Sequence, residues 1–135
     1  LCNNPPKLEY IDYIISIIVG PEVITGSTRM KAGTATKLVL NMITTTLMIK
    51  LNKTYGNLMV DLKASNDKLW DRGTRIIQHL TDLNYNDSLK LLQFADGEVK
   101  TAIVMEKMNV DVGDARECLS GKKGSLKIVL AGNSD

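Results

Sequence analysis

The sequence predicts a fragment of an α/β fold that is mostly helical: a last strand and its helices, followed by a small three-helix bundle. Three features indicate this class: an apolar strand-like run at 14–19, helical patterns at 27–52 and 65–80, and three short helical segments after residue 84. The chain has 135 residues, of which 44% are hydrophobic and 24% are charged. This size and balance suit one ordinary domain, or two small ones, with a packed core.

The first predicted element is a strand at residues 14–19, which are β-branched and apolar except for Ser16. Such a run is typical of a strand that is covered on both faces in a parallel sheet. Gly20 and Pro21 end it. Because a strand is not stable alone and no second strand of similar quality precedes residue 126, we expect the rest of the sheet to belong to a longer protein. A chain that begins at Leu1, without an initiator methionine, fits the same expectation.

A helix is predicted over residues 27–52, with Ser27 or Thr28 as its N-cap and Asn52 at its end. Apolar residues occur on nearly every side of this predicted helix, so that little of its surface is polar. A helix that is apolar nearly all round is buried in a larger body or in a subunit interface. We also expect the apolar faces that the missing sheet leaves exposed to favour self-association.

Next comes a turn at Tyr55-Gly56-Asn57, a short extended stretch from Leu58 to Leu62, and a second helix. Ser65 or Asn66 caps this helix, which reaches about Leu80 with its apolar residues at helical spacing.

Short helices are predicted at 87–95, 98–108 and 112–120, with Gly97 suited to a left-handed helix end. Their apolar residues are spaced for a common small core, onto which residues 126–130 could pack. We place a domain boundary at residues 82–86. Residues 1–82 then form the C-terminal part of one domain, and residues 83–135 form a small helical bundle.

Composition excludes several classes of function. Seventeen Lys and Arg against fifteen Asp and Glu give a net charge of +2, which does not predict nucleic-acid or membrane binding. Cys2 and Cys118 are too few for a disulfide framework and fit a reduced cytoplasm. With His79 as the single histidine, no His/Cys metal cluster can be written, and no apolar run approaches a membrane span.

The segment 20–34 has the chemistry of an anion site. It joins a predicted strand to the start of a helix, where free N–H groups and the helix dipole favour negative charge. Hydroxyls, two cations and glycines gather there, beside the carboxylate of Glu22; the candidate ligand-binding residues are Glu22, Thr25, Gly26, Ser27, Thr28, Arg29 and Lys31. The alternative interpretation is a capped helix with a solvated basic turn.

The same segment, with Gly26-Ser27-Thr28-Arg29-Met30-Lys31-Ala32-Gly33-Thr34 at its centre, resembles the signature of the N-acetylmuramic acid 6-phosphate etherases. The signature also recurs in the related glucokinase regulatory proteins. The likeness continues through 37–42, 55–61, 66–69, 75–76 and 102–105, and so covers roughly residues 14–120.

The resemblance implies a sugar isomerase (SIS) fold, a doubly wound α/β sandwich that binds phosphosugars, with residues 1–82 as its C-terminal part. It implies removal of D-lactate from N-acetylmuramic acid 6-phosphate by elimination and hydration, in the recycling of cell-wall amino sugars. Such etherases act as cytoplasmic homodimers without a metal or an organic cofactor. The family's catalytic glutamates lie in the N-terminal half, so we assign no catalytic residue in this chain and expect it to be inactive alone.

Two other hypotheses remain open. One is a regulatory protein that binds phosphosugars without chemistry. The other treats residues 85–120 as an interaction module that resembles ubiquitin-associated domains. Acidic residues outnumber basic ones in that range, which argues against a helix that reads DNA.

Overall fold

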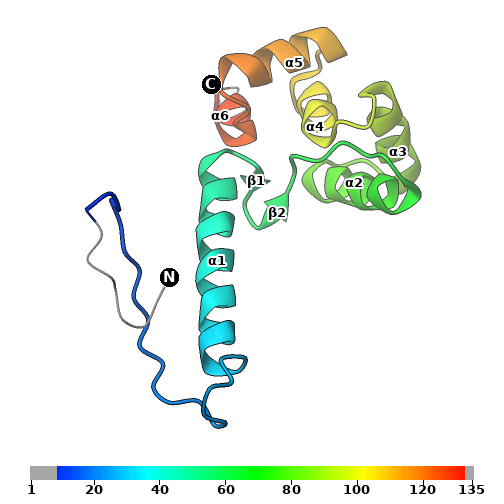
Figure 1. Ribbon diagram of the computed structural model, residues 1–135. Helices are drawn as coiled ribbons and strands as arrows, with labels where there is room; N and C mark the ends of the chain where they lie inside the picture. The colour runs from blue at the N-terminus through cyan, green and yellow to red at the C-terminus, as the bar shows by residue number, and fades with distance from the viewer. Residues whose placement is uncertain (1–8, 133–135) are drawn as a thin grey trace. The chain divides into compact units, whose positions relative to one another are not determined.

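The computed structural model describes residues 9–132 and is mostly helical, with one small two-stranded sheet in that range (Figure 1). The coarse prediction of a mostly helical α/β fragment is confirmed. In chain order the elements are α1 (Lys31–Lys50), β1 (Thr54–Tyr55), β2 (Leu58–Met59), α2 (Asp67–Leu80), α3 (Tyr85–Phe94), α4 (Val99–Met108), α5 (Val112–Gly121) and α6 (Leu126–Ala131).

The chain divides into two compact units, the first ending at Leu47 and the second beginning at Met48. The boundary predicted near residue 82 lies within the second unit, between α2 and α3. These two helices pack against each other.

In the first unit, the strand predicted at 14–19 does not form. Ser16 is a single bridge residue, and the neighbouring positions have no strand hydrogen-bonding pattern. Ile14, Ile15 and Ile18 are exposed. A strand is held by its neighbours in a sheet, and the only two-stranded sheet of residues 9–132 is the hairpin β1–β2. Within residues 9–132, the run 14–19 is therefore not a strand of a larger sheet.

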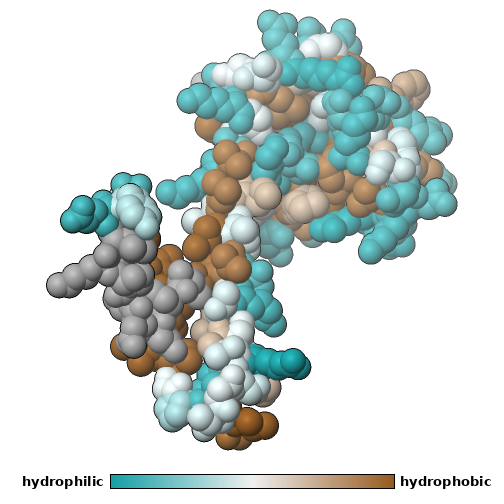
Figure 2. All heavy atoms as spheres, viewed as in Figure 1, coloured by the Kyte–Doolittle hydropathy of each residue, from teal (hydrophilic) through white to brown (hydrophobic). Residues whose placement is uncertain are grey.

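The helix predicted at 27–52 is present as α1, which begins at Lys31 and ends at Lys50. Asn52 follows it with a positive φ of 58° and donates its backbone N–H to the carbonyl of Ile49, so the predicted end is confirmed. No residue of α1 is buried. Figure 2 shows apolar side chains along the C-terminal part of α1; the exposed ones include Met42, Ile43, Leu47, Met48 and Ile49.

The second unit includes the last residues of α1 from Met48 on, and the hairpin follows them. The predicted turn at Tyr55-Gly56-Asn57 is confirmed, and across it Tyr55 pairs with Leu58, a pairing that the sequence analysis did not include. Asn66 caps α2 by accepting the N–H of Leu69 at 3.0 Å, which confirms the second predicted cap.

Helices α2–α6 share one core, in which α4 contacts α2, α3, α5 and α6. The three short helices are confirmed within a few residues, and α6 adds the buried Leu126 and Val129 to the same core. Since α2 also joins it, the body is larger than the predicted three-helix bundle. The buried apolar residues are Val60, Ala64, Ile76, Ile77, Leu92, Ala95, Val99, Ala102, Ile103, Val104, Ala115, Leu119, Leu126 and Val129.

Within the described range, none of the helices is both long enough and apolar enough to cross a membrane.

Candidate functional site

The predicted anion site is a loop that leads into α1. Gly20 and Gly26 hold positive φ angles of 72° and 83°, which glycine adopts without steric cost. Around Gly26, the N–H of Ser27 donates to the carbonyl of Ile24 at 3.0 Å and closes a turn. Six of the seven predicted ligand-binding residues lie in this loop, and the seventh, Lys31, is the first residue of α1.

Glu22 caps α1. Its Oε2 accepts the backbone N–H of Lys31 and its Oε1 accepts that of Ala32, each at 3.0 Å. The predicted caps Ser27 and Thr28 do not supply this side-chain bond, so that prediction is wrong. Hydrogen bonds from the amides of Ala32 and Lys31 hold the pKa of Glu22 below its ordinary value, because they favour the ionised carboxylate.

The two cations of the loop have different surroundings. Lys31 Nζ donates to the backbone carbonyl of Pro21 at 2.7 Å, so its ammonium is tied to the start of the loop. Arg29 is exposed and forms no hydrogen bond or ion pair with the rest of residues 9–132. The exposed hydroxyl-bearing residues Thr25 and Thr28 lie in two successive turns of the same loop, on either side of Ser27. A ligand anion at this loop would therefore meet the Arg29 guanidinium and hydroxyls.

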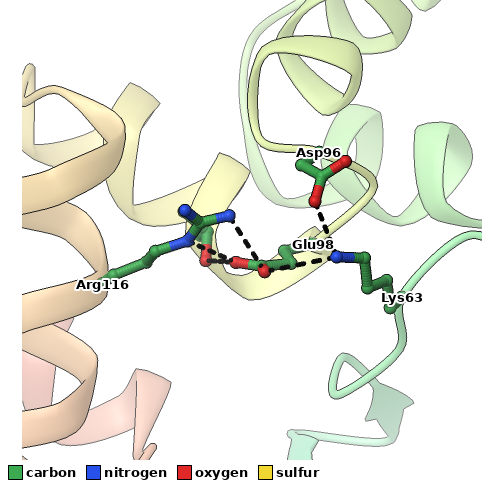
Figure 3. Close-up of polar contacts among 5 residues, drawn as sticks. Lys63, Asp96, Glu98 and Arg116 are labelled. Carbon is green, nitrogen blue, oxygen red and sulfur yellow. Dashed lines mark hydrogen bonds and ion pairs between the residues drawn. The ribbon is translucent and has the colours of Figure 1, made fainter.

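The second unit carries a charge network that sequence reasoning missed (Figure 3). Arg116 of α5 holds Glu98 with two bonds, from Nε at 2.9 Å and from Nη2 at 3.0 Å. Lys63 bonds Asp96 at 2.7 Å and lies 3.8 Å from Glu98. The bond from Arg116 holds the pKa of Glu98 below its ordinary value, against the opposing effect of burial.

A second part of this network surrounds Asp61. Lys100, whose side chain is 9% exposed, donates to Asp61 at 2.7 Å and to the carbonyl of Gly124 at 2.8 Å. Lys53 also pairs with Asp61. Burial raises the pKa of Asp61, but the bonds from Lys100 and Lys53 outweigh it and leave the pKa below its ordinary value. No short-range signal predicts such pairs, because their members lie far apart in the sequence.

Both parts of the network line an open cavity of about 500 Å³. Apolar side chains of Val60, Leu62, Val99 and Leu119 lie beside the charged ones. The lysines, arginine and carboxylates here are already paired with one another, so the contacts described above serve to join segments of the unit. Among residues 9–132, no group of three or more His, Cys, Asp or Glu is arranged to hold a metal ion.

Comparison with known proteins gives two findings. Residues 56–95 match the family model described as the C-terminal lid domain of glucokinase regulatory protein. The chain is also similar, along nearly its whole length, to curated N-acetylmuramic acid 6-phosphate etherases. It is 52% identical over 126 residues to the one from Bacillus pumilus, covering 93% of this chain and 42% of that protein.

Two other curated etherases show similar identity and coverage. The protein from Clostridium acetobutylicum is 55% identical over 126 residues, covering 92% of this chain and 42% of the relative. That from Rhodopirellula baltica is 47% identical over 135 residues, covering 99% of this chain and 45% of the relative. The predicted resemblance is confirmed, and the chain spans less than half the length of the relatives that it matches.

Proposed function

From its likeness to the N-acetylmuramic acid 6-phosphate etherases, we propose that this chain is the C-terminal portion of such an enzyme. The whole protein is then a carbon–oxygen lyase that converts N-acetylmuramic acid 6-phosphate to N-acetylglucosamine 6-phosphate and D-lactate. The observation that carries the proposal is 52% identity over 93% of the chain to a protein of that name. The first unit would complete a SIS domain, in a cytoplasmic homodimer.

The loop at 20–31 supplies substrate binding in this proposal. The exposed guanidinium of Arg29 pairs with the phosphate of the substrate, since planar N–H donors match phosphate oxygens in pairs. Thr25, Ser27 and Thr28 offer hydroxyls to the same group. These contacts hold the sugar while the rest of the enzyme acts on it.

The elimination needs two proton transfers, and the hydration that follows returns a proton to C2 as the hydroxyl of water is added. A base removes the proton at C2, and an acid protonates the ether oxygen as D-lactate leaves; water then adds to the unsaturated sugar. We assign neither role to a residue of this chain. Its contribution is to bind and orient the substrate, and effects of loop substitutions should appear mainly in KM.

The test is a chimera in which this chain replaces the matching 42% of the Bacillus pumilus enzyme. We expect D-lactate release from N-acetylmuramic acid 6-phosphate. Arg29→Ala should lower kcat/KM by about 100-fold, the effect of losing a charged contact to phosphate. Lys127→Ala, an exposed cation of α6, is the control and should leave kcat/KM unchanged. An Arg29→Ala variant as active as the unsubstituted chimera would contradict the proposed role of the loop.

A second candidate is a regulatory protein that binds phosphosugars without chemistry. The observation in its favour is the match of residues 56–95 to the lid domain of glucokinase regulatory protein. A folded chimera that binds the phosphosugar but releases no D-lactate would favour this candidate.

A further inference from the structure

The carboxylate of Glu22 occupies the position at the start of α1 where a bound anion would otherwise sit. Glu22 lies nine residues before Lys31 in the sequence. Its carboxylate accepts the backbone N–H groups of Lys31 and Ala32, with N···O distances of 3.0 Å in both cases. Helix N-terminal amides and the helix dipole attract negative charge, and here the chain supplies that charge itself.

The remaining amides of the first turn are also bonded. Gly33 donates to the carbonyl of Thr28 and Thr34 donates to that of Met30, each at 3.1 Å. The bond of Thr34 is the first intrahelical bond of α1, and the amides of Lys31, Ala32 and Gly33, which have no intrahelical partner, are each satisfied by other groups of the chain. A phosphate could bind these amides only by displacing Glu22.

The loop between Glu22 and α1 is tied at both ends. Besides the Glu22 bonds, the Lys31 ammonium donates to the carbonyl of Pro21 at 2.7 Å. The residues between these contacts include Arg29, whose guanidinium is exposed. The conformation that presents Arg29 therefore depends on the bonds of Glu22 to α1.

We propose that Glu22 is a positioning residue: its carboxylate replaces a ligand anion at the N-terminus of α1 and holds the loop that presents Arg29 to a phosphosugar. This inference rests on the proposed function for the identity of the ligand. It changes the role expected of Glu22 from contact with substrate to support of the loop, and it assigns recognition of the phosphate to side chains.

Three variants of the Bacillus pumilus chimera test the proposal. Glu22→Ala removes the carboxylate and leaves space, Glu22→Gln fills the space without a charge, and Glu9→Gln is a charge-matched control on an exposed carboxylate of the same unit. For Glu22→Ala we expect KM to rise about tenfold with kcat changed less than about threefold, since the loop binds substrate before and during reaction. The control should match the unsubstituted chimera.

Added sodium formate supplies a small carboxylate to the space in Glu22→Ala. We expect it to return KM toward that of the unsubstituted chimera, whereas equal sodium chloride does not. Formate should not restore Glu22→Gln, because the amide side chain blocks the space. An unchanged KM in Glu22→Ala, or a raised KM that formate does not restore in the folded variant, would overturn the proposal.

Hydrogen exchange gives a readout that does not need activity. In Glu22→Gln, peptides that contain Lys31 and Ala32 should exchange about tenfold faster, the effect of losing roughly 1.4 kcal/mol of amide protection. A raised KM with unchanged exchange would mean that Glu22 contacts the substrate directly, and the proposal would fail.

If the unsubstituted chimera releases no D-lactate, the proposed function fails while the exchange measurement still tests the role of Glu22. If Glu22→Ala does not fold, the exchange measurement on Glu22→Gln still shows whether Glu22 protects the amides of Lys31 and Ala32.

Discussion

At the scale of the residue, Gly73 lies at a point of close helix packing in the second unit. It is buried in α2, and a Cβ atom there would lie 2.9 Å from Leu92 Cδ2 and 2.9 Å from Val99 Cγ2. Both neighbours are fully buried, so neither side chain has room to move away. The missing side chain of Gly73 is what lets α2 approach α3 and α4.

Gly73→Ala should therefore destabilise the chain even though alanine favours helices. We expect overpacking to outweigh the propensity gain, with a net loss of about 1 to 2 kcal/mol in the free energy of unfolding. Urea unfolding, followed by the fluorescence of the single tryptophan Trp70, measures it.

The matched control is Gly121→Ala at the end of α5, where nothing lies within 4 Å of the added Cβ. There we expect a small gain of about 0.5 kcal/mol. Equal effects of the two substitutions would contradict the packing argument.

Residue-scale features show what the sequence predicts and what it does not. The Asn66 cap and the Gly56-Asn57 turn were predicted because their bonds join residues only a few positions apart. The Glu22 cap was missed because it spans nine residues and depends on how the loop folds back. The gathering of the predicted ligand-binding residues in one loop follows from their contiguity, whereas their contacts with a substrate stay a prediction.

At the scale of the element, Glu98 joins three segments of the second unit. It pairs with Arg116 of α5, accepts the hydroxyl of Thr101 at 2.9 Å, and forms an antiparallel bridge with Lys63 in the segment before α2. The ion pair with Arg116 is partly exposed, and its contribution is therefore modest. Because the ion pair needs an ionised Glu98 carboxylate, its contribution to stability changes with pH and can be measured in that way.

We expect Glu98→Gln to cost about 1 kcal/mol at pH 7 and to cost progressively less in acid. The pKa of Glu98 is lowered in the folded chain, so its contribution is complete above the ordinary value of 4.5 and is lost as pH falls through the lowered value. Urea unfolding at pH 7, 5 and 3 measures the difference between the variant and the unsubstituted chain.

Glu117→Gln, on the exposed surface of α5, is the control that removes a charge without removing an ion pair, and at pH 7 it should change the free energy of unfolding by less than about 0.5 kcal/mol. A cost of Glu98→Gln that grows in acid would contradict the assigned sign.

Elements also differ in how far their sequence determines them. Helices α2–α5 follow local periodicity and caps, and they were predicted within a few residues. The run at 14–19 has strand propensity but depends on neighbouring strands, so propensity alone did not predict its state. For α1 the sequence predicted a helix whose apolar surface is buried by other layers of a larger body. The helix is present, and its apolar side chains are exposed in this chain, as expected when those layers are absent from the described residues.

At the scale of the whole molecule, the two units differ in their source of stability. All the buried apolar residues of the shared core lie between Val60 and Val129, within the second unit. Over residues 9–47 no residue is buried. Because burial of apolar surface is the main driving force of folding, the second unit should account for the cooperative unfolding of the chain.

A fragment of residues 48–132 should accordingly fold alone, with a free energy of unfolding within about 0.5 kcal/mol of that of the full chain. Trp70 lies in this unit and has its side chain packed against the core, so its fluorescence reports the same transition in both molecules. A fragment whose melting temperature fell by more than about 5 °C would show that residues before Met48 stabilise the core. An unchanged transition would show that the second unit is a preformed body whose stability does not depend on the residues before Met48, as expected if all the buried apolar side chains of its core lie within it.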